Sequence, residues 1–551
     1  MNKDSGKLII FVIISGLILF GYQYFFAPKS VKKPAAQQVT SDSTPARSNS
    51  STSMPEAPAP EKKELKTALK ALAGDTYTVS NKVMEIDFSD AGAVVREIRL
   101  KKYTDTDVNL REKPIELAPN KSINTYMSLR SSSAQLDNVK WNYRGVTQAN
   151  GGQVVAFDRT VDGLKVTKEF FIPADSYHLT INIKVKNNSS VPESLKDLVL
   201  EWGPNIHYLP SDLVGRSGGA YKYNRIVYGG KKMKIVSINV NPKAKENKLT
   251  VLSDVPDWIA MKDLYFMSSF ILEDKTKIRS ARLREDAGGF AYIAVDFADT
   301  IVNPGKEETF SVGSYIGPQE YKKLAAIGMQ NSIDLGWSWI RPISVGMFYL
   351  MDFLYNMTKN WGVAIILITL IVRGILWLPS QNSYKHMKDM QKKMAIIQPR
   401  LDTMKKIYKD DPQKMNEEMM KLYQEYKINP LGGCLPMLLQ MPIFFALYAT
   451  LMNMVELKGA AFVFWLHDLS KPDRFYVLPI LMGASMFLQQ KMTKTIQSTP
   501  EQEQQQKIMM YAMPVMLTWM SFSWPSGLLL YWAVSNILSI LQQLFVNAQK
   551  D

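Results

Sequence analysis

The stretch GVAIILITLIVRGILWLPS, residues 362–380, decides the fold of this chain. It contains one ionisable side chain, Arg373, and at about 1.5 Å per residue a helix of this length approaches the ~30 Å hydrocarbon core of a bilayer. A guanidinium within a span costs from about 2.5 kcal/mol upward, so it normally faces a bundle interior or a water-filled cavity. On a straight helix that continues to Pro379, Arg373 lies roughly 9 Å from the helix end. At that depth the alternative is an arginine that snorkels to lipid phosphates.

Three further charge-free runs follow, at 431–455, 475–490 and 508–549. The last run is too long for one helix and must fold back on itself. Its natural corner is the sequence SWPSG at 523–527, because proline and glycine interrupt helices. We therefore expect residues 361–549 to form a helical membrane core with five spans.

The N-terminal residues 1–27 are expected to add a sixth span. Lys3 and Lys7 precede the uncharged run 8–26, and basic residues favour the cytoplasmic side. The alternative is a cleaved signal peptide, but the run exceeds a usual signal core and lacks a clear small-x-small cleavage site. Residues 28–62, rich in Pro, Ser, Ala and charge, predict a flexible linker.

Residues 63–330 show the alternation of apolar and polar residues that is typical of β-strands. Met84, Ile86 and Phe88 alternate with acidic residues, and the same period continues through residues 179–185. The dipeptide Asp162-Gly163 predicts a hairpin turn. Many short strands separated by polar turn residues indicate a large β-sandwich. The expected N-terminal span places this domain in the periplasm.

Residues 331–360 are rich in aromatic side chains interleaved with Arg341, Asp352 and Lys359. This pattern is typical of an amphipathic helix that lies in the membrane interface. The alternative, a true span at 343–357, is short and carries Asp352.

The segment 381–428 combines the densest basic cluster beside any span with apolar residues stepping by threes and fours. This spacing predicts a helical hairpin, with Asp411 and Pro412 starting its second arm and a kink near Pro399. Two helices packed on each other explain the seam by themselves. The functional interpretation goes further and predicts that the basic outer faces of the hairpin contact nascent chains, the ribosome or anionic lipids. The seam residues are Met387, Met390, Met394, Ile397, Leu401, Met404 and Tyr408, followed by Met415, Met419, Leu422 and Tyr426.

The expected spans supply neutral hydrogen-bonding groups for Arg373 but no carboxylate. Thr369 lies one turn from Arg373 on the same span, and an arginine without a built-in anionic partner predicts a hydrated groove whose counter-charge arrives with the substrate. The polar residues on the other spans are Gln440, Asn453, Ser485, Gln489, Thr518, Ser535, Asn536 and Gln542.

Methionine is concentrated in the same half, with 22 of the chain's 30 methionines in residues 345–551. Ordinary helix packing accounts for such a stripe. Because methionine adapts to many apolar partners, the functional alternative is a slide for client spans, formed by Met437, Met441, Met509, Met513 and Met516.

The sequence gives no sign of covalent chemistry. The histidines at 178, 207, 386 and 467 are not at metal-ligand spacing, and the single cysteine, Cys434, cannot form an internal disulfide. Phosphate-loop, metalloprotease and nucleophile-elbow patterns are missing. We expect no metal, no cofactor and no enzymatic activity. The net charge of +15 favours anionic lipid or ribosomal RNA over DNA as a partner.

Four motifs together resemble the YidC/Oxa/Alb family of membrane protein insertases, in its Gram-negative form. They are NWG at 360–362, TLIVRG at 369–374, NPLGGCLPMLLQMPIFFALY at 429–448 and PSGLLLYWAVSN at 525–536. The resemblance covers nearly the whole chain. It implies a five-helix core whose groove opens to the cytoplasm and inner leaflet, with Arg373 at its centre and Thr369 and Trp532 at groove positions. The family's periplasmic domain is similar in fold to sugar mutarotases, but Glu201 and His207 are weak grounds for sugar chemistry.

The resemblance implies a multi-pass inner-membrane insertase and chaperone with both termini in the cytoplasm. Its partners would be nascent membrane proteins and the Sec translocon, and no nucleotide would be hydrolysed. Two rival functions remain. One is a secondary transporter or channel, although intramembrane acidic residues are missing. The other is an assembly factor docked on the translocon.

Overall fold

The computed structural model describes residues 72–106, 112–118, 126–206, 225–230, 236–239, 246–252, 254–287, 290–408, 411–428, 435–492 and 508–548. The expected N-terminal span and linker lie outside the described residues, and so does Cys434.

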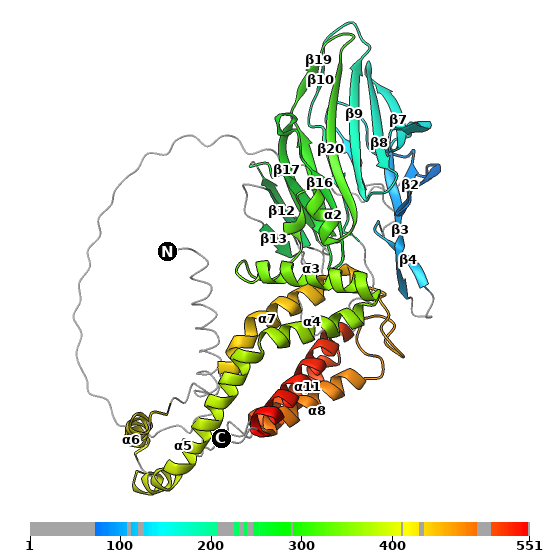
Figure 1. Ribbon diagram of the computed structural model, residues 1–551. Helices are drawn as coiled ribbons and strands as arrows, with labels where there is room; N and C mark the ends of the chain where they lie inside the picture. Colours follow the sequence, from blue (N-terminus) through cyan, green and yellow to red (C-terminus); the bar gives the residue numbers. More distant parts are fainter. Residues whose placement is uncertain are drawn as a thin grey trace, which may run out of the picture. The chain divides into compact units, whose positions relative to one another are not determined.

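Residues 76–318 form antiparallel sheets (Figure 1). The largest has nine strands, in the order β13 (Val236–Asn239), β12 (Arg225–Gly229), β15 (Trp258–Lys262), β16 (Phe266–Ile271), β20 (Glu307–Pro318), β9 (His178–Asn187), β8 (Leu164–Pro173), β7 (Gly152–Val161) and β6 (Asn142–Ala149). The second has five, in the order β14 (Lys248–Leu252), β17 (Ile278–Asp286), β18 (Phe290–Phe297), β11 (Val199–Trp202) and β5 (Ser128–Arg130). Phe297 and Phe310 join the two sheets in one apolar core, with ring centroids 5.1 Å apart.

Two smaller sheets complete this part. One has four strands in sequence order, β1 (Thr76–Ser80), β2 (Met84–Ser89), β3 (Val94–Thr106) and β4 (Glu112–Glu116), and the other pairs β10 (Glu193–Leu195) with β19 (Thr300–Val302). A short helix, α2 (Tyr321–Ala326), follows β20.

The strand alternation expected from the sequence is confirmed. Met84, Ile86 and Phe88 are buried, and β9 alternates between buried and partly exposed residues over most of its length. The turn between β7 and β8 is also confirmed, because Val161 pairs with Leu164 and both Asp162 and Gly163 have positive φ angles. Such a two-residue turn matches the twist of its strands.

The remaining described residues are mainly helical. The helices are α3 (Arg341–Thr358), α4 (Trp361–Ile375), α5 (Trp377–Ile407), α6 (Pro412–Glu425), α7 (Leu435–Asn453), α8 (Val477–Met492), the π-helical turn η7 (Ile508–Ala512), α10 (Met513–Ser521) and α11 (Ser526–Ala548). Helix α11 packs against α4, α8 and the start of α5. The break between α10 and α11 lies at the expected SWPSG corner.

The expectation of a straight helix up to Pro379 is wrong. Helix α4 ends at Ile375, and α5 starts at Trp377 with a bend of 57°. The physical reason is Pro379, whose ring would clash with the carbonyl of residue 375 in a continuous helix but fits the first turn of a new one. Arg373 therefore lies in the last turn of α4.

Helices α5 and α6 form the hairpin that the sequence predicts. Met394, Ile397 and Leu401 on α5 pack against Met419 and Leu422 on α6. Asp411 caps α6 by accepting from the Lys414 amide, as expected, and Pro412 occupies the first turn. The first arm begins at Trp377, four residues before the expected 381, because the helix restarts directly after the bend.

The expected six spans stay a prediction. Within the described residues, one helix, Ser526–Val546, is long and apolar enough to cross a membrane, with a mean hydropathy of 1.5. A second counts only if the bent pair α4 and α5 is one span. Prolines and the π-helical turn divide this part of the chain into shorter helices.

Candidate functional site

Arg373 lies near the C-terminal end of α4, on the side that packs against α11. Arg373 is only 9% exposed, and the residues beside it in the sequence are apolar. The charge is thus enclosed by the helices, which is the interior position expected for an intramembrane arginine.

The hydroxyl of Ser535 on α11 is the central acceptor of this site. Arg373 donates to Ser535 Oγ from Nε at 3.1 Å and from Nη2 at 2.6 Å. Gln440 on α7 donates to the same oxygen from Nε2 at 3.3 Å. Helices α4, α7 and α11 therefore meet at one hydroxyl.

This arrangement has more donors than acceptors. A serine hydroxyl offers two lone pairs, whereas three N–H groups from Arg373 and Gln440 point at it. Among the described residues, no carboxylate lies within ion-pair distance of Arg373, and no acceptor is found for its Nη1. Chemically, this arrangement can bind a further hydrogen-bond acceptor, preferably an anionic one.

A second polar layer lies on α11 beyond Arg373. Tyr384 on α5 packs against Val546 of α11, and Gln542 donates to the carbonyl of Trp377 at 3.0 Å. Gln543 is buried, and its Oε1 has no partner in the described part of the chain.

Sequence reasoning missed Tyr531, Tyr384, Ser539 and Gln543. Tyr531 is buried one turn before Ser535 on the same helix. The signal was present in the spacing, because residues 531, 535, 539 and 543 repeat every four positions and share one helix face. Tyr384 had no such signal, since only the bend after α4 brings it to α11.

Other predicted site residues make different contacts. Thr369 is buried, and its hydroxyl donates to the carbonyl of Ile365 in its own helix. Asn536 donates to Ser485 Oγ at 3.1 Å and so faces α8. Trp532 stacks on Trp524, with ring centroids 5.5 Å apart, and contacts Phe444.

The expected methionine slide is only partly described. Met516 on α10 is 50% exposed, and Met513 and Met441 are half-buried. The side chains of Met437 and Met509 lie outside what the structure describes. Gly483 of α8 allows α10 to approach closely, because a Cβ there would meet the Thr518 hydroxyl at 1.9 Å.

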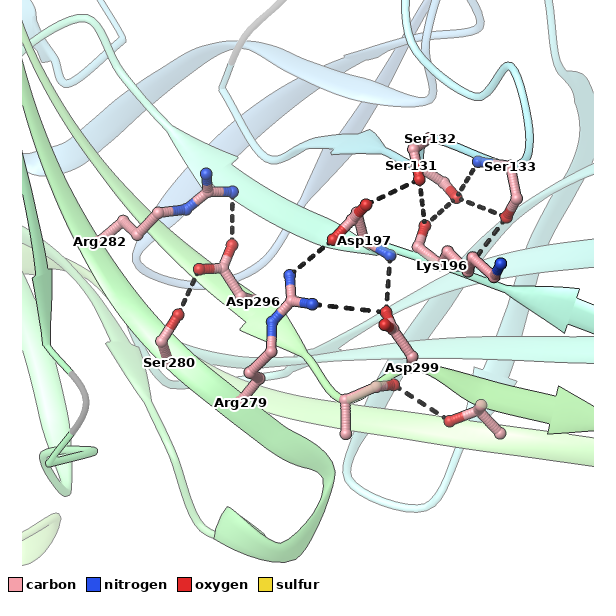
Figure 2. Close-up of polar contacts among 12 residues, drawn as sticks. Ser131, Ser132, Ser133, Lys196, Asp197, Arg279, Ser280, Arg282, Asp296 and Asp299 are labelled. Carbon is pink, nitrogen blue, oxygen red and sulfur yellow. Dashed lines mark hydrogen bonds and ion pairs between the residues drawn. The ribbon is translucent and has the colours of Figure 1, made fainter. Parts of the chain in front are cut away.

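The outer face of the five-stranded sheet carries a separate polar network. Figure 2 shows Arg279 between Asp197 and Asp299, while Arg282 and Ser280 both contact Asp296. Serines 131–133 add hydrogen bonds to the 196–197 backbone and side chains.

Glu201 belongs to the same sheet and does not stand free. It pairs with Arg130 at 2.6 Å and with Arg284 at 3.6 Å, while His207 lies outside the described residues. Each oxygen of this carboxylate is thus contacted by an arginine. The described part of this sheet therefore gives no support to sugar chemistry.

Comparisons with known proteins cover both parts of the chain. A family model for the YidC periplasmic domain matches residues 76–350, and one for the 60Kd inner membrane protein matches residues 353–551. The chain is 32% identical over 566 residues to a membrane protein insertase YidC of Laribacter hongkongensis (strain HLHK9), covering 99% of this chain and 98% of the relative. It is 33% identical over 569 residues to the corresponding protein of Nitratidesulfovibrio vulgaris (strain DP4), covering 98% and 99%. A solved structure of an active YidC insertase covers 88% of this chain and 96% of its own, at 17% identity and a TM-score of 0.35.

Proposed function

The chain belongs to the YidC family of membrane protein insertases, and from this premise we propose that it inserts integral membrane proteins into the inner membrane and helps them fold. The observation that carries the proposal is Arg373, enclosed by helices and bonded to a neutral hydroxyl with no carboxylate among its described neighbours. A permanent internal ion pair would leave nothing for a substrate to bind. An arginine held by serine keeps its charge available.

In this mechanism a short hydrophilic segment of a client enters a polar groove centred on Arg373, with Thr369, Gln440, Trp532, Ser535 and Asn536 as its lining. The segment's carboxylates or carbonyls pair transiently with the guanidinium. Meanwhile the client's apolar span moves along Met437, Met441, Met509, Met513 and Met516 into the lipid. Transfer of apolar groups, at about 0.8 kcal/mol per buried methylene, supplies the drive, and no nucleotide is needed.

The proposed topology has six spans with both termini in the cytoplasm and the β domain in the periplasm. The α5–α6 hairpin is then cytoplasmic, where its basic outer faces can contact the ribosome or anionic lipid. The Sec translocon is a further partner for clients with large translocated domains. These assignments rest on the charge distribution and on the family.

The test is insertion by purified protein in liposomes of two single-span clients that differ only in their translocated segment. One segment carries aspartates and the other carries asparagines at the same positions. We expect Arg373→Ala to lower insertion of the acidic client about tenfold or more, since the lost charge pairing is worth on the order of 1–3 kcal/mol. Neutral-client insertion should fall much less.

Arg373→Lys is the matched control, because it keeps the charge and loses the planar fork. It should retain only part of the preference for the acidic client, because the charge stays but the fork that binds a carboxylate at two points is lost. Equal insertion of both clients by Arg373→Ala would remove the electrostatic part of the mechanism. Solute flux without any client insertion would instead favour a transporter.

A further inference from the structure

We propose that Ser535 is a positioning residue that sets the charge specificity of insertion. Its hydroxyl orients the Arg373 guanidinium and satisfies one edge of it without neutralising the charge. The inference rests on the proposed function and adds a residue that determines which clients Arg373 helps to insert.

The geometry of the two hydrogen bonds defines which part of the guanidinium stays available. Nε and Nη2 of Arg373 both donate to Ser535 Oγ, at 3.1 and 2.6 Å, so the side edge of the guanidinium is occupied. A guanidinium carries five donors in one plane. The end formed by Nη1 and the second N–H of Nη2 therefore remains for an acceptor. That end can bind a carboxylate in a two-point fork.

The position of Ser535 is fixed by three helices. Ser535 is 2% exposed on α11 and accepts from Gln440 of α7 as well as from Arg373 of α4. Tyr531 is buried one turn earlier on the same face of α11. A hydroxyl held in this way cannot follow the guanidinium if it turns, so it sets the direction of the free end.

At position 535 a hydroxyl suits this role better than a carboxylate or a methyl group. A carboxylate at position 535 would take both N–H groups in a fork and cancel the positive charge. An alanine would leave Nε and Nη2 buried without an acceptor, so the guanidinium would rotate toward another one. Serine accepts from both Nε and Nη2 of Arg373 and leaves the positive charge for the client.

The alternative role is purely structural, in which Ser535 only ties α4 to α11. The two roles differ in what they predict for client preference. A structural tie affects folding and lowers the insertion of every client alike. A positioning role changes the ratio of acidic to neutral insertion.

The experiment measures this ratio for the full protein in liposomes, with the aspartate and asparagine clients described above. Ser535→Ala and Ser535→Asp should both lower the ratio about fivefold or more, toward the value of Arg373→Ala. Ser535→Thr keeps the hydroxyl and should retain the wild-type ratio. Adding Ser535→Ala to Arg373→Ala should lower the ratio no further, since both act through one guanidinium.

Thermal unfolding of each variant in detergent reports whether it folds. A wild-type ratio in folded Ser535→Ala or Ser535→Asp would overturn the role of Ser535 and leave the proposed function intact. A wild-type ratio in Arg373→Ala would overturn both. If Ser535→Ala does not fold, the contrast between Ser535→Asp and Ser535→Thr decides the question.

Discussion

Asn360, Trp361 and Gly362 each contribute a different contact to the start of α4. The Asn360 side chain accepts hydrogen bonds from the amides of Gly362 and Val363 and so caps the helix. Trp361 stacks on Tyr355 with ring centroids 4.2 Å apart. Gly362 lies against the ring of Phe462, where a Cβ would come within 2.1 Å of a ring carbon. The close approach positions the helix that carries Arg373.

We expect Gly362→Ala to destabilise the protein by about 1–3 kcal/mol, because the added methyl forces the Phe462 ring out of its place. The measurement is the thermal unfolding midpoint in detergent. Gly346→Ala on α3 is the matched control, since a Cβ there meets nothing within 4 Å. In a helix interior alanine is preferred over glycine, so the control should keep or raise the midpoint. A normal midpoint for Gly362→Ala would show that the ring contact is not tight.

At the scale of elements, the turn that follows α7 brings a carboxyl to the end of the β domain. Glu456 lies in the short helix η6 (Val455–Leu457). It lines a small cavity together with Gln319, Asn453 and Phe348. Burial raises the pKa of Glu456 to about 7, with a further contribution from the charge of Glu320. Asp352 acts in the same direction and Lys102 against it.

This raised pKa predicts a pH dependence of stability. Between about pH 4.5 and 7 the unfolded chain ionises this carboxyl while the folded chain keeps its proton. The unfolded state then binds fewer protons, so the free energy of unfolding falls as the pH rises through this window. Glu456→Gln should remove this fall, giving a higher unfolding midpoint than the wild type at pH 8 and a similar one at pH 5.

The control for this prediction is Glu307→Gln, an exposed position on β20. It should leave the pH profile of the unfolding midpoint close to that of the wild type. The same profile for Glu456→Gln and the wild type would mean that water reaches the carboxyl freely. The connection between the β domain and the helices would then not depend on its protonation.

At the scale of the whole molecule, insertion requires two different surfaces on the same helices. Met513 on α10 is half-buried, whereas Val515, two residues further, is 70% exposed. Residues two apart on a helix point in different directions. Under the proposed mechanism, we expect the half-buried side to contact a client and the exposed side to contact lipid.

Photocrosslinking can separate the two surfaces. A photoreactive residue at Gln440 or Met513 should crosslink to a stalled nascent membrane protein, and one at Val515 should crosslink mainly to lipid. The control is the same set of probes with a stalled soluble protein, which should give no client crosslink. Crosslinks from Gln440 to partner subunits alone would favour a docked assembly factor.

The sequence by itself determined the family of this chain and predicted its division into a β region and a helical region. The period of two in the β region, the charge-free runs and the four motifs depend only on local pattern, and the family comparisons confirm the resemblance. Arg373 also stood out locally, because a single charge in an apolar run is visible without any structure.

Only the tertiary structure decided what Arg373 touches. Residues 373, 440 and 535 are far apart in the chain, and helix periodicity does not say which faces meet or where a helix bends. The bend after Ile375, caused by Pro379, brings Tyr384 to α11, and packing of α4 and α7 on α11 makes Ser535 the shared acceptor. A side chain's type fixes the hydrogen bonds that it can make, but the packing of distant helices selects its partner.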